Sequence, residues 1–241
     1  MAGNENERDG MLPELEFVCE LASDLESQGV RCWIDSGTLL GIYRDGKLIP
    51  GDNDIDIGVL IEAHHSLSSV AEQIRRFLAS TGRRTRIVNY AGSPYKIKSG
   101  TESEQPLASP LDVDINIFRE SGPHAWCPQT YGVRRPDQPR DLPWLIRRTA
   151  YQLLRFRKSP DPGRFPWSRI LVTGTWWYPI EYVRNVRRFQ SVYPVPDRID
   201  EYLAMRYGDW RTPDPGWSFK NDGALRTARP EELVGHPDAD T

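Results

Sequence analysis

The stretch Asp54-Ile-Asp-Ile-Gly-Val-Leu60 alternates strictly between acidic or small residues and branched apolar residues. Successive side chains of a β-strand point to opposite faces, so the pattern predicts a strand with one buried face. Asp54 and Asp56 then project side by side from its other face. Two carboxylates held in this way can bind a hard cation if a neighbouring strand supplies a third oxygen ligand.

A second strand bearing aspartates is predicted from Leu111 to Phe118, where polar and apolar residues again alternate. Asp114 is the expected third carboxylate, and Asp112 is the competing choice. A Mg²⁺ ion, or Mn²⁺ in its place, could then bridge the phosphate oxygens of a donor and neutralise developing charge. An Asp-x-Asp pair alone is a weak signal, since solvent-facing aspartates also protect edge strands from aggregation.

The residues before Asp54 predict a helix, a strand, a turn and a short helix. Apolar residues recur at helical spacing from Leu15 to Leu25, and Val30 to Asp35 alternates like a strand. The turn formed by residues 36–38 follows, where a small residue and a helix N-terminus favour a bound phosphate. A simple turn with an N-cap would use the same residues. Gly37 and Thr38 are therefore candidate donor-binding residues.

Two cationic residues are further candidates for contact with the donor. Lys96 lies on a predicted strand between the two aspartate strands and could meet a donor phosphate as a point charge, although a solvated edge lysine would look the same. Arg44 follows the glycine turn and could clamp a phosphate through two hydrogen bonds. The alternative for Arg44 is a structural ion pair with Asp45 or Asp52.

The remaining pattern adds helices and strands on either side of the second aspartate strand. A helix is predicted over residues 67–78, and two short strands over 86–90 and 95–98. Beyond residue 119 the pattern weakens, and we expect helices over about residues 142–157 and 197–207.

Length and composition favour a single compact unit. The 241 residues include 38% hydrophobic and 27% charged residues, with no stretch long enough to span a membrane and no signal peptide in the polar opening segment. We therefore expect a cytoplasmic protein. Three widely spaced cysteines argue against a disulfide framework or a zinc site. The expected organisation is a disordered N-terminus (1–12), a catalytic core that carries the aspartate strands (13–120), a substrate-binding part packed on it (121–220) and a polar tail (221–241).

Charge is distributed unevenly along the chain. Residues 131–190 contain 13 Arg or Lys and 4 Asp or Glu, a net +9, so the other residues carry −12 of the total −3. An acidic half joined to a basic half suits a protein that holds metal and phosphate together. Solvated helix faces are the alternative for most of these arginines. Because tryptophans interleave with them, we expect contacts to donor or acceptor phosphates and no nucleic-acid surface.

Two long motifs resemble a known family. The run Asp35-Ser-Gly-Thr-Leu-Leu-Gly-Ile-Tyr-Arg-Asp-Gly-Lys-Leu-Ile-Pro-Gly-Asp-Asn-Asp-Ile-Asp-Ile-Gly58 closely resembles the signature of the LicD and fukutin-related family, and the run from Pro196 to Pro213 is similar to its closing segment. The resemblance spans roughly residues 15–215. It implies an α/β fold of the nucleotidyltransferase type, with a mixed sheet flanked by helices and a C-terminal part that is helical and rich in aromatic residues and arginine.

The resemblance also implies an activity and its residues. Family members of this kind transfer a phospho-alcohol, such as phosphocholine or ribitol phosphate, from a CDP-linked donor to a hydroxyl of a sugar, glycan or small metabolite. Residue by residue, Gly37 and Thr38 match the glycine turn, Asp54 and Asp56 the metal pair, and Asp114 the third-aspartate strand.

One departure and two alternatives accompany the resemblance. Where relatives usually have a tryptophan and three consecutive acids, this chain has Gly51-Asp52-Asn53-Asp54, which alters the donor pocket and leaves the metal pair intact. The same metal site would also serve a nucleotidyltransferase that moves a nucleoside monophosphate from a triphosphate to a small acceptor. A non-catalytic module that binds an anion or nucleic acid is the alternative of another class, against which the three intact aspartates argue.

Overall fold

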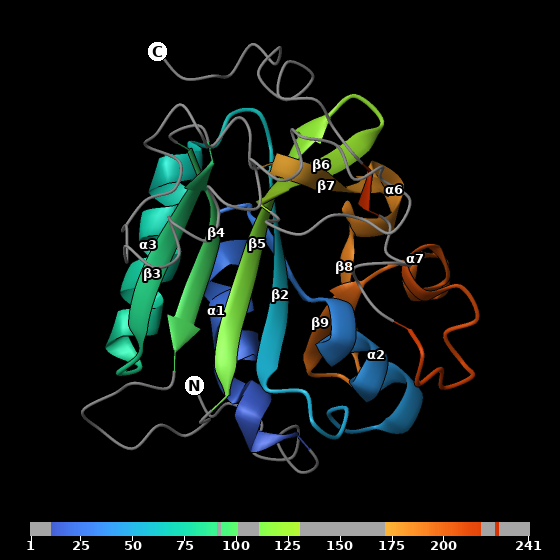
Figure 1. Cartoon of the computed structure of the whole chain (residues 1–241). Helices are drawn as coiled ribbons and strands as arrows, with labels where there is room; N and C mark the ends of the chain where they lie inside the picture. Colours follow the sequence, from blue (N-terminus) through green and yellow to red (C-terminus); the bar gives the residue numbers. More distant parts are fainter. Residues whose placement is uncertain (1–10, 91–92, 101–110, 131–171, 218–224, 227–241) are drawn as a thin grey trace, which may run out of the picture.

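An eight-stranded mixed sheet forms the centre of the computed structural model, which describes residues 11–90, 93–100, 111–130, 172–217 and 225–226 (Figure 1). Its strands are β1 (Arg31–Ile34), β2 (Asp54–Ile61), β3 (Arg84–Tyr90), β4 (Ser93–Gly100), β5 (Asp112–Ser121), β6 (His124–Thr130), β7 (Val172–Pro179) and β10 (Leu225–Arg226). A small second sheet pairs β8 (Val186–Phe189) with β9 (Tyr193–Pro196).

The two aspartate strands are direct neighbours. β2 and β5 run parallel, with Asp54 opposite Asp112 and Asp56 opposite Asp114, whereas the other pairings in the sheet are antiparallel. β4, the strand of Lys96, lies between the two aspartate strands in the sequence, and in the sheet it pairs with the other edge of β5. A parallel pair needs a long connection, and this one contains α3 (Leu67–Ser80) together with β3 and β4.

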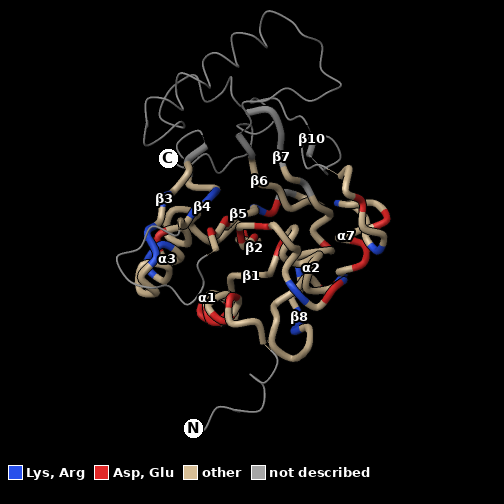
Figure 2. Tube along the Cα trace, turned by 60° about the horizontal axis from the view of Figure 1, so that its bottom comes forward, with Lys and Arg blue, Asp and Glu red and all other residues tan. Residues whose placement is uncertain are grey.

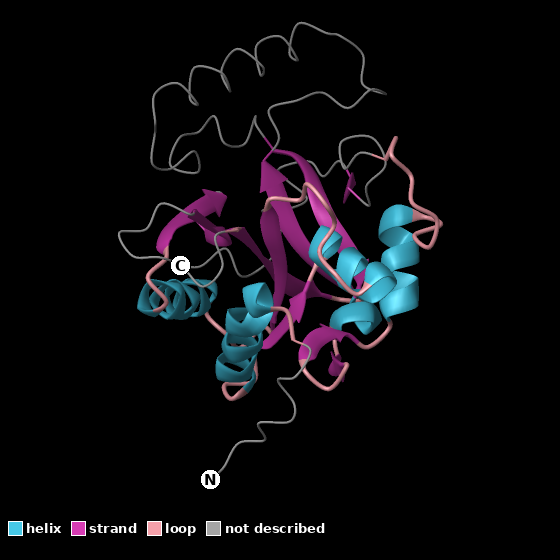
Figure 3. Ribbon diagram, turned by 90° about the horizontal axis from the view of Figure 1, so that it is seen from below, coloured by secondary structure: helices cyan, strands magenta, loops and turns pink. Residues whose placement is uncertain are grey.

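The apolar face of β2 and β5 is fully buried. Ile55, Ile57 and Val59 are inaccessible to solvent, as are the alternating apolar residues of β5. Helices α1 (Glu16–Glu26) and α3 lie on this side of the sheet (Figures 1 and 3) and bury their own apolar stripes there. Burying each such side chain contributes about 1.5–3 kcal/mol, so a one-residue slip of either strand would be strongly disfavoured.

On the opposite face, Gly58 admits a large aromatic ring from β1. Trp33 pairs with Gly58 across the strands and is fully buried. A Cβ atom at Gly58 would lie 2.2 Å from Trp33 Cε2. The indole therefore packs flat across β2, directly beyond Asp56 along the strand.

The remaining helices are α2 (Ser36–Asp45), α6 (Ile180–Val183), α7 (Ile199–Tyr207) and a 3₁₀ turn (Pro13–Leu15). The helices predicted over 15–25, 67–78 and 197–207 are confirmed to within a few residues at each end, as are the strands predicted before residue 119. The chain continues into the same sheet through β6 and β7, which the sequence pattern did not predict. The helix expected over 142–157 lies outside the described residues, as does most of the basic segment.

Candidate functional site

Three carboxylates meet where β2 and β5 run side by side. Asp54, Asp56 and Asp114 each offer an oxygen, and these oxygens all lie within 4.8 Å of one another. Asp54 and Asp56 are partly buried, and Asp114 is 8% exposed. An all-oxygen, anionic set of this kind fits a hard divalent cation such as Mg²⁺ or Mn²⁺. The parallel register is what brings Asp114 beside Asp56.

Because these carboxylates are close together and partly buried, their ionised forms are unfavourable unless a cation is bound. The pKa of Asp56 is raised to about 8, mainly by burial and then by like-charge repulsion from Asp35 and Asp54, while Arg206 acts in the opposite direction. A cation bound between Asp54, Asp56 and Asp114 would reverse that penalty. The carboxylate oxygens and the repulsion between their charges therefore both favour a bound metal ion.

Asp114 accepts hydrogen bonds from two lysines of β4. Lys98 Nζ lies 2.7 Å from both carboxylate oxygens, and Lys96 Nζ lies 2.8 Å from Oδ2. Burial would raise the pKa of Asp114, but the two ammonium groups outweigh it, and the pKa lies below its ordinary value. The predicted site residue Lys96 is thus at the carboxylate cluster. Asp112, the competing third ligand, is exposed and falls outside the group of three.

The N-terminus of α2 lies against the same cluster. Asp35 is the N-cap, and its Oδ1 accepts from the Ser36 backbone N–H at 2.7 Å. Helix α2 begins directly at Ser36, so Gly37 is in its first turn. A Cβ atom at Gly37 would lie 2.7 Å from Asp52 Oδ2 and 3.9 Å from Asp56 Oδ2. A larger residue than glycine would therefore displace the Asp52 carboxylate from beside the helix N-terminus, a position that favours an anion.

Two predicted donor-binding residues have structural partners. The hydroxyl of the buried Thr38 accepts from the backbone N–H of Asp56 at 2.9 Å, which ties α2 to β2. Arg44 pairs with Asp45 through Nε and Nη2, with Nη2 2.8 Å from Oδ2. The structural alternative for Arg44 is the one observed. Thr38 acts on the site through Asp56.

Asp52 is an acidic residue of the site that the sequence analysis named only as a possible partner of Arg44 and as part of a departure from the family pattern. The pKa of Asp52 is raised to about 6, mainly by burial and then by Asp54 as a hydrogen-bonding and charged neighbour. The carboxylate lies between the first turn of α2 and the metal pair. Its signal in the sequence was its place two residues before Asp54.

Buried polar side chains of α7 form a hydrogen-bonded network next to the carboxylate cluster. Tyr202 donates a short hydrogen bond to Asp35 Oδ1, and Arg206 donates one to the hydroxyl of Tyr178. The guanidinium of Arg206 also stacks on Trp176, with its carbon 3.7 Å from the ring centroid. All five side chains are buried. Trp176 and Tyr178 are therefore core residues, and the closing motif supplies Tyr202 as a partner of Asp35.

Residues 29–134 match the family model described as LicD/FKTN/FKRP, nucleotidyltransferase domain. This match confirms the resemblance carried by residues 35–58. Ribitol 5-phosphate transferase FKRP of Homo sapiens is 50% identical over 38 residues, which cover 16% of this chain and 8% of that protein. Ribitol-5-phosphate transferase FKTN of Macaca fascicularis is 31% identical over 116 residues, 46% of this chain and 22% of that protein. The matched stretches thus span under a quarter of either relative.

A solved structure of Cid1, described as having RNA terminal uridylyl transferase activity, is 18% identical, with a TM-score of 0.33, and covers 47% of this chain and 30% of that chain. The mixed sheet with its flanking helices, together with the family match, makes this an α/β fold of the nucleotidyltransferase type. No helix among the described residues is long and apolar enough to cross a membrane.

Proposed function

We propose, with residues 29–134 as a domain of the LicD/FKTN/FKRP type, that the chain is a metal-dependent transferase that moves a phospho-alcohol from a CDP-linked donor to a hydroxyl group. The observation that carries the proposal is the group formed by Asp54, Asp56 and Asp114 beside the N-terminus of α2. Because the named relatives are ribitol 5-phosphate transferases, a polyol phosphate is the first transferred group to test, with phosphocholine as the second.

In this proposal, one group of residues binds the metal ion and another binds the phosphates of the donor. Asp54, Asp56 and Asp114 would hold Mg²⁺ or Mn²⁺, which supplies charge neutralisation at the diphosphate. The first turn of α2 at Gly37 presents backbone N–H groups and the positive end of a helix dipole, which favour the donor phosphates on the β2 side of the cluster. Lys96 and Lys98 add positive charge on the β5 side.

In the proposed reaction, the acceptor oxygen attacks the phosphorus that carries the alcohol. The bond from that phosphorus to the bridging oxygen breaks, CMP leaves, and the proton of the acceptor hydroxyl passes to a carboxylate of the cluster. Binding the donor in the opposite orientation would present the other phosphorus and lead to nucleotidyl transfer. The orientation of the nucleotide therefore determines which half is transferred.

The test is the mass of the nucleotide product. The protein is incubated in Mg²⁺ with CDP-ribitol, CDP-choline or CTP and a panel of hydroxyl acceptors, and products are identified by mass spectrometry. CMP with a phospho-alcohol on the acceptor is expected from a CDP donor, and D54N should release none. Pyrophosphate released from CTP, with the nucleotide attached to an acceptor, would replace the proposal with nucleotidyl transfer.

A further inference from the structure

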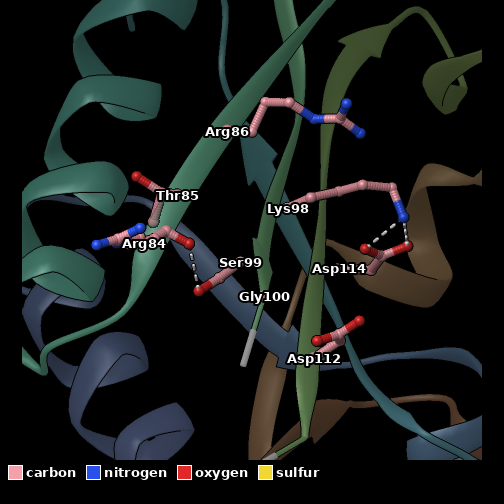
Figure 4. Close-up of a pocket in the computed structure, with 8 residues that line it drawn as sticks. All are labelled: Arg84, Thr85, Arg86, Lys98, Ser99, Gly100, Asp112 and Asp114. Atoms are coloured by element: carbon pink, nitrogen blue, oxygen red, sulfur yellow. Dashed lines mark hydrogen bonds and ion pairs between the residues drawn. The ribbon is translucent and has the colours of Figure 1, made fainter. Parts of the chain in front are cut away.

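A cavity of about 310 Å³ lies at the end of β1 that is away from the carboxylate cluster. β1 begins at Arg31, which lines the cavity, and leads to Asp35, the N-cap of α2. At about 3.3 Å per residue, Arg31 and Asp35 lie roughly 13 Å apart along the chain. The pocket on β3, β4 and β5, where Lys98 donates to Asp114 (Figure 4), is on the far side of β2 from β1. The cavity is therefore separate from the candidate functional site.

Three elements enclose the cavity. They are the C-terminal half of α1, the start of β1 and the segment that leads from α6 into β8. Figure 2 shows β1 between α1 and β8, with acidic positions on α1 and basic positions on β8. A cavity of this volume suits a small organic molecule, which would contact all three elements at once.

One wall of the cavity is apolar. Ala22, Val30 and Cys32 belong to the buried core, each at most 3% exposed, and Val186 of β8 packs against that core. Burial raises the pKa of the Cys32 thiol well above its usual range, so the thiol is uncharged at neutral pH. A ligand that covers this apolar wall needs an apolar body of its own.

The charged residues of the lining are mostly cationic. Arg31, Arg184 and Arg188 line the cavity with the carboxylate of Glu26, three positive charges against one negative, a net +2. Arg188 Nη2 donates to Glu26 at 2.8 Å, and Arg184 Nη2 donates at 2.9 Å to Glu120, which is outside the lining. A guanidinium carries five N–H donors, so these pairs leave donors for a ligand. Exposed ion pairs are worth at most about 1 kcal/mol and can rearrange around it.

We propose that this cavity binds a small organic anion that consists of one carboxylate on a short apolar body. The carboxylate lies at Arg184 and Arg188, whose planar guanidinium groups can each donate two parallel hydrogen bonds, and the body covers the apolar wall. A monoanion fits better than a doubly charged phosphate ester, because Glu26 repels negative charge at the same place. The inference is independent of the proposed function, since none of these residues belongs to the carboxylate cluster.

The test uses phenylacetate as the probe. It is titrated into the isotopically labelled full chain, and the backbone amide signals are followed by NMR. We expect saturable shifts at Gly29 and Val30, which line the cavity, and none at Gly37. Phenylacetamide has the same body without the charge, so it should bind at least about tenfold more weakly, because the charge-assisted hydrogen bonds are lost.

Two neighbouring arginines of β8 provide a matched pair of variants. R188Q should bind phenylacetate at least about tenfold more weakly, because a charged hydrogen-bond donor is lost. R187Q should bind it like the unaltered protein, since Arg187 is outside the lining and successive strand residues face opposite sides. V186F should abolish binding, because its ring would fill part of the cavity. Amide spectra of the free variants check that each one is folded.

Four results would overturn the inference. These are no saturable shift up to about 10 mM probe, equal affinity of R188Q and the unaltered protein, equal affinity for phenylacetamide, or shifts centred on Lys96 and Lys98, which would assign the anion to β4. The proposed function is tested separately, by the nucleotide product. Binding of phenylacetate together with pyrophosphate release from CTP would keep this site and replace the proposed reaction.

Discussion

Asp54 and Asp56 each contribute a carboxylate oxygen that an isosteric amide cannot replace. D54N and D56N remove a negative charge from the group of three with little change in volume, so we expect the fold to persist and turnover to fall below detection. Calorimetric titration of Mg²⁺, activity and circular dichroism would be compared for both variants. Native-like dichroism with full activity in either variant, or full activity in a chelator, would contradict the metal role.

The third ligand is tested by a pair of variants from one strand. D114N should lose Mg²⁺ binding, and D112N should keep it, because Asp112 is exposed and lies outside the group of three oxygens. The measurement is again calorimetric titration of Mg²⁺ into each variant. The reverse outcome would make Asp112 the ligand and Asp114 the partner of the lysines alone.

Gly58 is a residue whose missing side chain matters. In G58A the new methyl group would overlap the indole of Trp33, and β1 would have to shift. We expect a loss of about 1–3 kcal/mol in the free energy of unfolding, the usual cost of overpacking a core. Urea denaturation measures it. The double variant W33L/G58A should show less than the sum of the two single losses, and strict additivity would mean that the two residues do not compete for space.

At the scale of elements, helix α7 supports the carboxylate cluster through buried polar groups. R206M would remove the partner of Tyr178, the cation stacked on Trp176 and a positive charge that stabilises the ionised form of Asp56. We expect a loss of about 3–5 kcal/mol in the free energy of unfolding, as for other broken buried charge networks. R198M, at an exposed arginine preceding the same helix, should cost under about 1 kcal/mol. Equal losses in the two variants would refute the structural role of Arg206.

Helices and strands with a regular spacing of apolar residues could be predicted from the sequence. The order of the strands in the sheet could not. The alternation at residues 54–60 fixes a strand and its buried face, because the period of two is a local property. The pairing of β2 with β5, and the place of β4 beyond them, depends on contacts between distant residues that no local pattern contains. For this reason Lys96 was a candidate, whereas Lys98, two residues later on the same face, was missed.

Strands β6 and β7 show the other reason for failure. His124 to Thr130 mixes buried Ala125, Trp126 and Cys127 with Pro128, so it has neither a strict alternation nor a continuous apolar run. Its strand conformation comes from pairing with β7 and not from local preference. The roles of Tyr202 and Arg206 were hidden in the same way, since an amphipathic pattern does not show that their polar tips are buried.

For the whole molecule, we expect the free energy of unfolding to depend on the Mg²⁺ concentration, because the carboxylate cluster would bind the ion only in the folded state. At a Mg²⁺ concentration of 100 times its Kd, binding adds about 2.7 kcal/mol to the free energy of unfolding, which raises Tm by roughly 5–10 °C for a chain of this size. D54N should lose this shift. Without metal, D54N should be at least as stable as the unaltered protein, because it removes like-charge repulsion from Asp56. Thermal unfolding of both proteins, with Mg²⁺ and with chelator, measures the four values, and an equal Mg²⁺ shift in D54N would contradict the link.

The hydrogen bond from Tyr202 to Asp35 joins residues 167 positions apart, so the two residues are synthesised at different times. A ribosome that adds about 5–20 residues per second would leave Asp35 without its partner for roughly 10–30 s after its own synthesis. During synthesis, the hydrogen-bonded support of the carboxylate cluster is therefore complete only after helix α7 has been made. A translational pause placed before residue 199 would hold back the mature site while the strands that bear its aspartates were already made.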